Sequence, residues 1–237
     1  MNEPRPPRAE SLPSPRRPSP LSGPTAPGGP VWYAAYGSNM HAGRLARYLS
    51  GGRPTGAARS YSGCRDRTPP ARTLPILLSG TLYFALESST WTGGTAFYDP
   101  APGGDLPARA YLLTAGQFAD IAAQEMYREP AADLDLTRVL TAGRDRVGPG
   151  RYETLLRLGG LDGIPVLTFT APGTLADAVL NPPSAAYLAT MAAGLAEAHG
   201  WSAARAATYL ATRPGAATRW TPESALRAIR SAAAPSA

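Results

Sequence analysis

The fold of this chain is decided by one stretch, Val31-Trp32-Tyr33-Ala34-Ala35-Tyr36-Gly37-Ser38-Asn39-Met40. Val, Trp and Tyr favour a packed strand, Gly37 permits backbone conformations that are costly for other residues, and Ser38 or Asn39 can cap a following helix. Such a turn points backbone N–H groups outward at the positive end of a helix dipole, which suits a carboxylate or a phosphate. The alternative is an ordinary strand-to-helix connection, which these residues alone favour because short motifs often arise by chance.

The length and composition predict a single domain with a tail at each end. The chain has 237 residues, and 43% of them are hydrophobic, enough for a sizeable core. Residues 1–30 are rich in proline and poor in large apolar side chains, so we expect a disordered tail there. A tail of this kind also suits docking to a protein that reads PxxP segments, although unpartnered linkers are commoner. We expect the folded domain at 31–211 and a short helix with a low-complexity end at 212–237.

The positive charge of the chain is concentrated in one segment. The formal net charge is +6, and all 23 basic residues are arginines. Seven arginines and one aspartate lie between residues 44 and 72, so this segment alone equals the whole excess. It is interleaved with Pro and Gly and contains no recognisable nucleic-acid-binding module. We therefore expect no nucleic-acid partner.

Cysteine and histidine are scarce, which limits the chemistry available. Cys64 is the single cysteine, and His41 and His199 are the only histidines. An internal disulfide is excluded, and a zinc site built from Cys and His ligands cannot be assembled. No apolar run is long enough to span a membrane, and the N-terminus lacks the apolar core of a signal peptide. We therefore expect a cytoplasmic protein with no metal, no cofactor and no membrane partner.

Strand patterns dominate the first two thirds of the chain, and helices gather toward its end. The expected strands lie at 31–36, 74–86 with a break near Ser79-Gly80, 94–98, 108–113, 151–157 and 164–170. The expected helices lie at 41–49, from Thr114 onward, and at 184–199, 202–210 and 222–229. This order predicts an α+β fold with a bent mixed or antiparallel sheet, for which a small β-barrel with surrounding helices is the natural closure.

A carboxylate interrupts the apolar face of the helix that follows Thr114. Phe118, Ile121 and Ala122 form the apolar stripe, and Glu125 occupies its next position. An unpartnered carboxylate on a buried face is costly, and burial favours the protonated form that a general acid needs. Two interpretations are equally favoured by the spacing. Glu125 is either such an acid/base or an edge residue, for example one paired with Arg128.

Glu129 is the competing carboxylate on this helix. It lies four residues after Glu125 and next to Pro130, where the helix is expected to end. Helix ends are more often exposed to solvent, so Glu125 is the stronger candidate.

The motif Tyr36-Gly37-Ser38-Asn39-Met40, followed by a helix that carries Arg44-Leu45, resembles the signature of the γ-glutamylcyclotransferase-like family, actinobacterial type. The resemblance extends over 31–210, and only two short motifs in it are specific. It implies the family's bent β-barrel and a small-molecule γ-glutamyl substrate. It also implies that Tyr36, Gly37, Ser38, Asn39 and Met40 bind the substrate, whose carboxylate end the turn holds. The family's catalytic glutamate corresponds to Glu125.

The chemistry implied by the resemblance is an intramolecular cyclisation. The amine of a γ-glutamyl group attacks its own γ-carbonyl and releases 5-oxoproline and an amine, with Glu125 transferring the proton and no metal or cofactor taking part. The chain departs from the family pattern in three places. Met126 stands where many members have Gly, the strand at Ala108–Tyr111 lacks the usual Gly, and the arginine-rich loop at 53–73 resembles an insertion. Glutathione, other γ-glutamyl amines and a different acylated amine all remain compatible substrates.

Two other classes of function are compatible with parts of the sequence. A catalytically inactive member of the same fold would bind a small molecule or a protein, and would have Glu125 exposed or more than about 10 Å from the Gly37 turn, beyond the reach of proton transfer. Zinc-dependent deacetylation is sometimes attached to sequences of this type. Two histidines without clustered aspartates leave little from which to build a zinc site.

Overall fold

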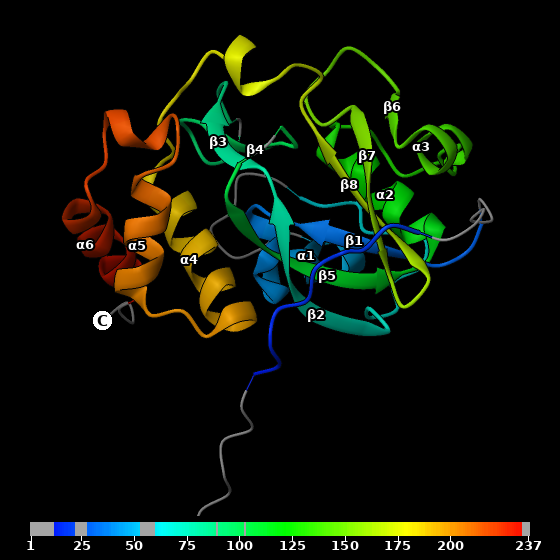
Figure 1. Ribbon diagram of the computed structural model, residues 1–237, viewed down its shortest axis with the longest axis horizontal. Helices are drawn as coiled ribbons and strands as arrows, with labels where there is room; N and C mark the ends of the chain where they lie inside the picture. Colours follow the sequence, from blue (N-terminus) through cyan, green and yellow to red (C-terminus); the bar gives the residue numbers. More distant parts are fainter. Residues whose placement is uncertain (1–11, 22–27, 53–59, 89, 102, 234–237) are drawn as a thin grey trace, which may run out of the picture.

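The computed structural model describes residues 12–21, 28–52, 60–88, 90–101 and 103–233 (Figure 1). A six-stranded sheet forms its centre, with strands in the order β2 (Arg72–Ser79), β5 (Asp105–Leu113), β1 (Val31–Ala35), β8 (Ile164–Thr170), β7 (Thr154–Leu161) and β6 (Arg144–Arg146). A second sheet pairs β3 (Thr81–Ala85) with β4 (Thr95–Asp99). The helices are α1 (Ala42–Ser50), α2 (Ala115–Glu125), α3 (Thr137–Ala142), α4 (Ala185–His199), α5 (Ala203–Ala211) and α6 (Pro222–Ala233).

The central sheet is mixed, which confirms the predicted α+β class. β1 pairs with β8 in parallel and with β5 in antiparallel orientation, and the other neighbours in the sheet are antiparallel. The β3–β4 ribbon is tied to β8 by the Thr170 side chain, which receives and donates hydrogen bonds with the Tyr98 backbone at 3.0 and 2.6 Å. In the described part of the chain, continuous strand pairing does not close these sheets into the expected barrel.

β1 is buried on both faces because helices cover both sides of the sheet (Figure 1). Side chains alternate along a strand. Trp32 and Ala34 therefore enter the core beneath α4, α5 and α6, whereas Val31, Tyr33 and Ala35 enter the core beneath α1 and α2. The chain leaves β1 between these two cores, so the turn that follows is held by both.

The turn after β1 differs from the prediction. A short 3₁₀ helix, η1 (Ser38–Met40), follows the strand, and His41 caps α1 by accepting a hydrogen bond from the Arg44 N–H at its Nδ1, 3.2 Å away. The expected cap at Ser38 or Asn39 is therefore wrong. The reason is local, because the Met40 N–H donates to the Gly37 carbonyl oxygen and closes η1 before α1 begins.

Other predicted boundaries agree with the structure. α2 begins after Thr114 as expected, where Thr114 and Gln117 form a capping box, and Gly200 ends α4 in the left-handed conformation. Gly80 separates β2 from β3 with φ of 142°, and a Cβ there would lie 2.4 Å from the Asp99 carbonyl oxygen. The break therefore requires glycine.

Residues 12–21 depart from the prediction of a disordered tail. The Arg16 N–H donates to the Pro75 carbonyl oxygen on β2, and Ser19 exchanges two backbone hydrogen bonds with Gly160 on β7. Arg16 and Arg17 also form ion pairs with Asp162 and Asp105. Backbone pairing to two strands holds this segment, which a composition rich in proline did not indicate. Residues 1–11 and 22–27 lie outside the described residues.

The C-terminal helix α6 packs against α4 and α5, with Ala225 and Ile229 buried in their shared core. The predicted boundary at 211/212 thus falls between helices of one core, α5 and α6. None of the described helices combines the length and the apolar character that crossing a bilayer demands.

Candidate functional site

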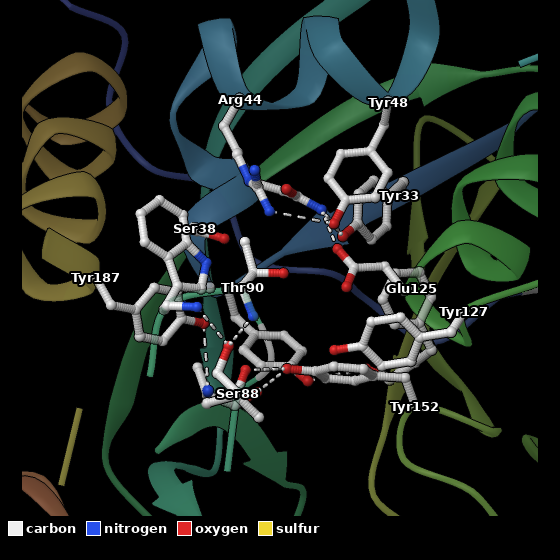
Figure 2. Close-up of a pocket in the computed structure, with 17 residues that line it drawn as sticks. Tyr33, Ser38, Arg44, Tyr48, Ser88, Thr90, Glu125, Tyr127, Tyr152 and Tyr187 are labelled. Atoms are coloured by element: carbon white, nitrogen blue, oxygen red, sulfur yellow. Dashed lines mark hydrogen bonds between the residues drawn. The ribbon is translucent and has the colours of Figure 1, made fainter. Parts of the chain in front are cut away.

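A cavity opens where the ends of β1, β4 and α2 meet the start of α1 (Figure 2). Its cavity volume is about 50 Å³, and it opens to solvent. Its walls are formed by Tyr33, Tyr36, Gly37, Ser38, Asn39, Arg44, Tyr48, Ser88, Thr90, Trp91, Thr95, Ala96, Glu125, Tyr127, Tyr152, Phe169 and Tyr187. Eight of these seventeen residues are aromatic, and seven of the others carry a hydroxyl, an amide or a charge. Aromatic rings and polar groups therefore share the walls, which suits a small molecule that carries polar groups.

Four residues of the predicted turn line this cavity, namely Tyr36, Gly37, Ser38 and Asn39. The Tyr36 hydroxyl donates to the Phe169 carbonyl oxygen at 2.9 Å, which ties the end of β1 to β8. Met40 does not line the cavity. Its side chain is fully buried in the core beneath α4, and its carbonyl oxygen accepts hydrogen bonds from Arg109 and Tyr111. The structure therefore brings four of the five predicted turn residues to the site.

Glu125, the last residue of α2, reaches the same cavity from the opposite direction. Its carboxylate is half-buried, and its Oε1 accepts a hydrogen bond from Asn39 Nδ2 at 2.9 Å. This contact joins the turn to a residue 86 positions away in the chain. Figure 2 shows the carboxylate pointing into the space between the aromatic rings.

The neighbours of Glu125 exclude one pairing that the sequence left open. Arg128 forms its ion pair with Glu153 and not with Glu125. The competing carboxylate, Glu129, is exposed and accepts a hydrogen bond from the Ser62 hydroxyl, away from the cavity walls. Glu125 is thus the carboxylate that lines this cavity.

Tyrosine hydroxyl groups surround the carboxylate. The Tyr33 hydroxyl accepts from Asn39 Nδ2 at 3.2 Å, the Tyr152 hydroxyl lies 2.9 Å from that of Thr95, and the Tyr187 hydroxyl accepts from the Ala96 N–H at 3.2 Å. Burial raises the pKa of Tyr33 and Tyr152 well above the usual range. These hydroxyls therefore stay protonated at neutral pH and can donate hydrogen bonds.

The raised tyrosine pKa values predict alkaline destabilisation. Burial also raises the pKa of Tyr36 and Tyr48 well above the usual range. Since the unfolded chain loses these protons first, near pH ~10, the contribution of these tyrosines to the free energy of unfolding should be constant below that pH and fall as the pH rises above it. Denaturant unfolding at a series of pH values checks this, together with tyrosinate absorbance. Full ionisation of the cavity tyrosines in the folded protein near pH 10 would contradict it.

Arg44, on the first turn of α1, supplies the cation of the cavity. Its guanidinium carbon lies 5.3, 5.0 and 5.0 Å from the ring centroids of Tyr48, Tyr61 and Trp91. Its Nη2 donates a long hydrogen bond of 3.4 Å to the Tyr48 hydroxyl. The sequence had placed Arg44 only within the family motif and gave no sign that it faces the site.

The described residues offer no metal centre. No group of three or more His, Cys, Asp or Glu side chains in the described ranges is arranged to hold an ion. His41 caps α1 and lies 3.5 Å from Glu197, and His199 contacts the Ala108 carbonyl oxygen. These donors do not fit a catalytic zinc site, which takes three protein ligands.

Comparisons with known proteins find similar proteins that carry different names. No family model matches it. A protein of Arabidopsis thaliana named Histone deacetylase 5 is 30% identical over 198 residues, which cover 76% of this chain and 30% of that protein. The chain therefore spans less than a third of the length of this relative.

Two solved structures are similar to the chain. One is titled gamma-glutamyl cyclotransferase, with a TM-score of 0.43 and 16% identity, and the match covers 72% of this chain and 80% of that chain. The other is a protein from Homo sapiens described as uncharacterized, with a TM-score of 0.42 and 16% identity over the same shares of the two chains.

Proposed function

We propose that this protein is a γ-glutamylcyclotransferase-type enzyme that cleaves a γ-glutamyl amine or peptide into 5-oxoproline and a free amine. The observation that carries the proposal is the hydrogen bond between Asn39 Nδ2 and Glu125 Oε1 inside one aromatic cavity. It joins the two features that stood out in the sequence, a turn suited to a carboxylate and a carboxylate suited to proton transfer. The resemblance of the Tyr36–Met40 motif to the γ-glutamylcyclotransferase-like family supports the same reaction.

The reaction is an internal acyl transfer. The substrate's α-amino nitrogen, after losing a proton to the Glu125 carboxylate, attacks the γ-carbonyl carbon and forms the bond that closes a five-membered lactam. The bond from that carbon to the leaving nitrogen then breaks as Glu125 returns the proton to the departing amine. The ring nitrogen loses its second proton to the same carboxylate, which passes it to the released amine, so the products are the neutral lactam and an ammonium ion. Atoms and charges balance without water, a metal or a cofactor. General acid/base catalysis of this kind contributes ~10²–10⁴-fold to a rate.

The cavity supplies what an internal reaction needs. The nucleophile and the carbonyl belong to one molecule, so the protein has to select the folded conformer and manage protons and charge. The protonated Tyr33 hydroxyl lines the cavity and can donate to the negative charge that develops on the γ-carbonyl oxygen, whereas the Tyr152 hydroxyl already donates to the Ala96 carbonyl oxygen at 2.8 Å. Asn39 fixes the carboxylate because its Nδ2 holds Glu125 Oε1.

A pair of substrates tests the reaction class. The protein should release 5-oxoproline from at least one member of a panel of γ-glutamyl amines and dipeptides. It should release nothing from the same compound when its α-amino group is acetylated, because the blocked nitrogen cannot close the ring. Equal turnover of the acetylated compound would contradict internal attack. Binding of the panel without release would instead favour the inactive binding member of this fold.

A further inference from the structure

We propose that Arg44 binds the α-carboxylate of the substrate, and that the site therefore selects molecules with an unmodified glutamyl head, bearing both a free ammonium and a free carboxylate. This inference rests on the function proposed above and adds a specificity residue to it. The turn at Gly37 was expected to hold the carboxylate through backbone N–H groups alone. The cavity also contains the Arg44 guanidinium, which binding by the turn alone does not require.

The first observation is that Arg44 forms no ion pair with any residue in the described part of the chain. Among the described residues no carboxylate lies within 4.0 Å of its guanidinium nitrogens, although ion pairs of that length connect other arginines to acids. Its neighbours include three aromatic rings and the side-chain oxygens of Tyr48 and Tyr61. An arginine stays charged at any relevant pH. The Glu125 carboxylate in the same cavity acts on this charge at longer range and forms no ion pair with it, so the guanidinium can still bind an anionic ligand.

The second observation concerns polar atoms without hydrogen-bond partners. Within the described part of the chain only three buried side-chain nitrogen or oxygen atoms lack one, and two of them belong to residues of this cavity, Arg44 Nε and Asn39 Oδ1. One is a donor and the other is an acceptor. Buried polar groups are normally paired, so an unpaired donor and an unpaired acceptor on the walls of one cavity indicate a ligand that brings both partners.

The positions of the charged groups in the cavity indicate which ligand would be complementary to it. Arg44 and Glu125 lie on either side of the Tyr48 hydroxyl in Figure 2, and both face the same space. The cation and the anion of the site are thus separated by a neutral group and do not pair directly. An α-amino acid head fits between them, with its ammonium toward Glu125 and Asn39 Oδ1 and its carboxylate toward Arg44. This orientation also delivers the nucleophilic nitrogen to the general base.

Arg44 is held in place before any substrate binds. Three aromatic rings stack around its guanidinium, from Tyr48 on α1, Tyr61 and Trp91. Because the rings come from separate segments, they fix the planar group without consuming all its donors. The competing explanation is that Arg44 only braces these rings, in which case its replacement would affect every substrate alike. The experiment below separates the two.

The test combines one substitution in the protein with one change in the substrate, so that four pairs of protein and substrate are compared. Wild type and Arg44→Met are assayed on a γ-glutamyl alkylamine and on its analogue in which the α-carboxylate is a carboxamide. We expect Arg44→Met to lower kcat/KM for the free acid by roughly 10- to 100-fold, as for loss of a charge-assisted hydrogen bond, mostly through KM. On the carboxamide the two proteins should be nearly equal. Arg47→Met, an exposed change on the same helix outside this cavity, is the matched control.

Each outcome decides the matter. An equal loss on both substrates would show that Arg44 only shapes the cavity, and the inference would fail while the proposed function stands. Absence of 5-oxoproline from either substrate with wild type would remove the proposed function and this inference together. If Arg44→Met does not fold, wild type alone gives the answer. A carboxamide turned over as well as the free acid overturns the inference, and a KM raised at least 10-fold for the carboxamide supports it.

Discussion

Glu125→Gln is expected to reduce kcat for 5-oxoproline release by ~10²–10⁴-fold, the usual contribution of a positioned acid/base group. An amide cannot take the proton from the substrate ammonium. Its oxygen can still accept the hydrogen bond from Asn39 Nδ2 that the carboxylate accepts now, so the cavity should keep its shape. The melting temperature should therefore stay close to that of wild type. Steady-state assays with the best substrate of the panel, together with thermal unfolding, make the measurement.

Glu129→Gln is the matched control for this substitution. Glu129 lies four residues further along, is exposed, and has its hydrogen-bond partner outside the cavity walls. The control should retain wild-type kcat. If Glu125→Gln also kept full turnover, Glu125 would have no part in the proton transfer. If both variants lost activity equally, the loss would reflect general damage to the end of α2.

Gly194→Ala is expected to combine a loss of stability with a larger loss of turnover. Gly194 lies in α4 against the turn after β1, and a Cβ there would lie 2.7 Å from both the His41 nitrogen and Met40 Cβ. These atoms belong to the backbone of the turn or are bonded to it and cannot swing aside, so the helix or the turn must move. Overpacking costs ~1–3 kcal/mol, partly offset by the ~1 kcal/mol that alanine gains in a helix.

The effect of Gly194→Ala on activity follows from what the turn holds. Asn39 adjoins Met40, and Asn39 Nδ2 orients the Glu125 carboxylate. A misplacement of about 1 Å at a reacting group can cost ~10²-fold in rate. We therefore expect kcat to fall by roughly 10- to 100-fold in protein that remains folded at the assay temperature, as unfolding curves and kinetics on the same preparation would show.

Gly116→Ala controls for the helix substitution itself. Gly116 lies in the first turn of α2, and the nearest atom that a Cβ would meet there is 3.6 Å away, an ordinary contact. This variant should be neutral or more stable by up to ~1 kcal/mol and should keep its activity. Wild-type kcat in Gly194→Ala would contradict the account of how α4 positions the turn.

The two features that were predicted from the sequence each break a local pattern. The Gly37 turn ends an apolar strand abruptly, and Glu125 occupies a position where the helix calls for an apolar side chain. Deviations of this kind can be recognised from the sequence alone because they interrupt the hydrophobic periodicity of the strand or helix. The turn and Glu125 line one cavity and are joined through Asn39. This proximity depends on how α2 packs against the end of β1, which no local sequence pattern encodes.

The rest of the cavity gave no such signal. Tyr187 on α4 has a spacing typical of a core residue, and its ring is buried while its hydroxyl reaches the site. Tyr152 precedes β7 and Arg44 lies on α1, so their convergence is a tertiary property. Residues 12–21 show a related limit, since backbone hydrogen bonds to β2 and β7 hold a segment whose side chains suggested disorder.

The most direct test of the central claim is the origin of the oxygen atoms in the acidic product. Wild-type protein is incubated with a γ-glutamyl amine in water enriched in heavy oxygen, and the product is analysed by mass spectrometry. Internal attack by the α-amino nitrogen uses no water, so the account predicts unlabelled 5-oxoproline in equal amount to the released amine. Labelled glutamate as the first product would show that water is the nucleophile and would contradict the account.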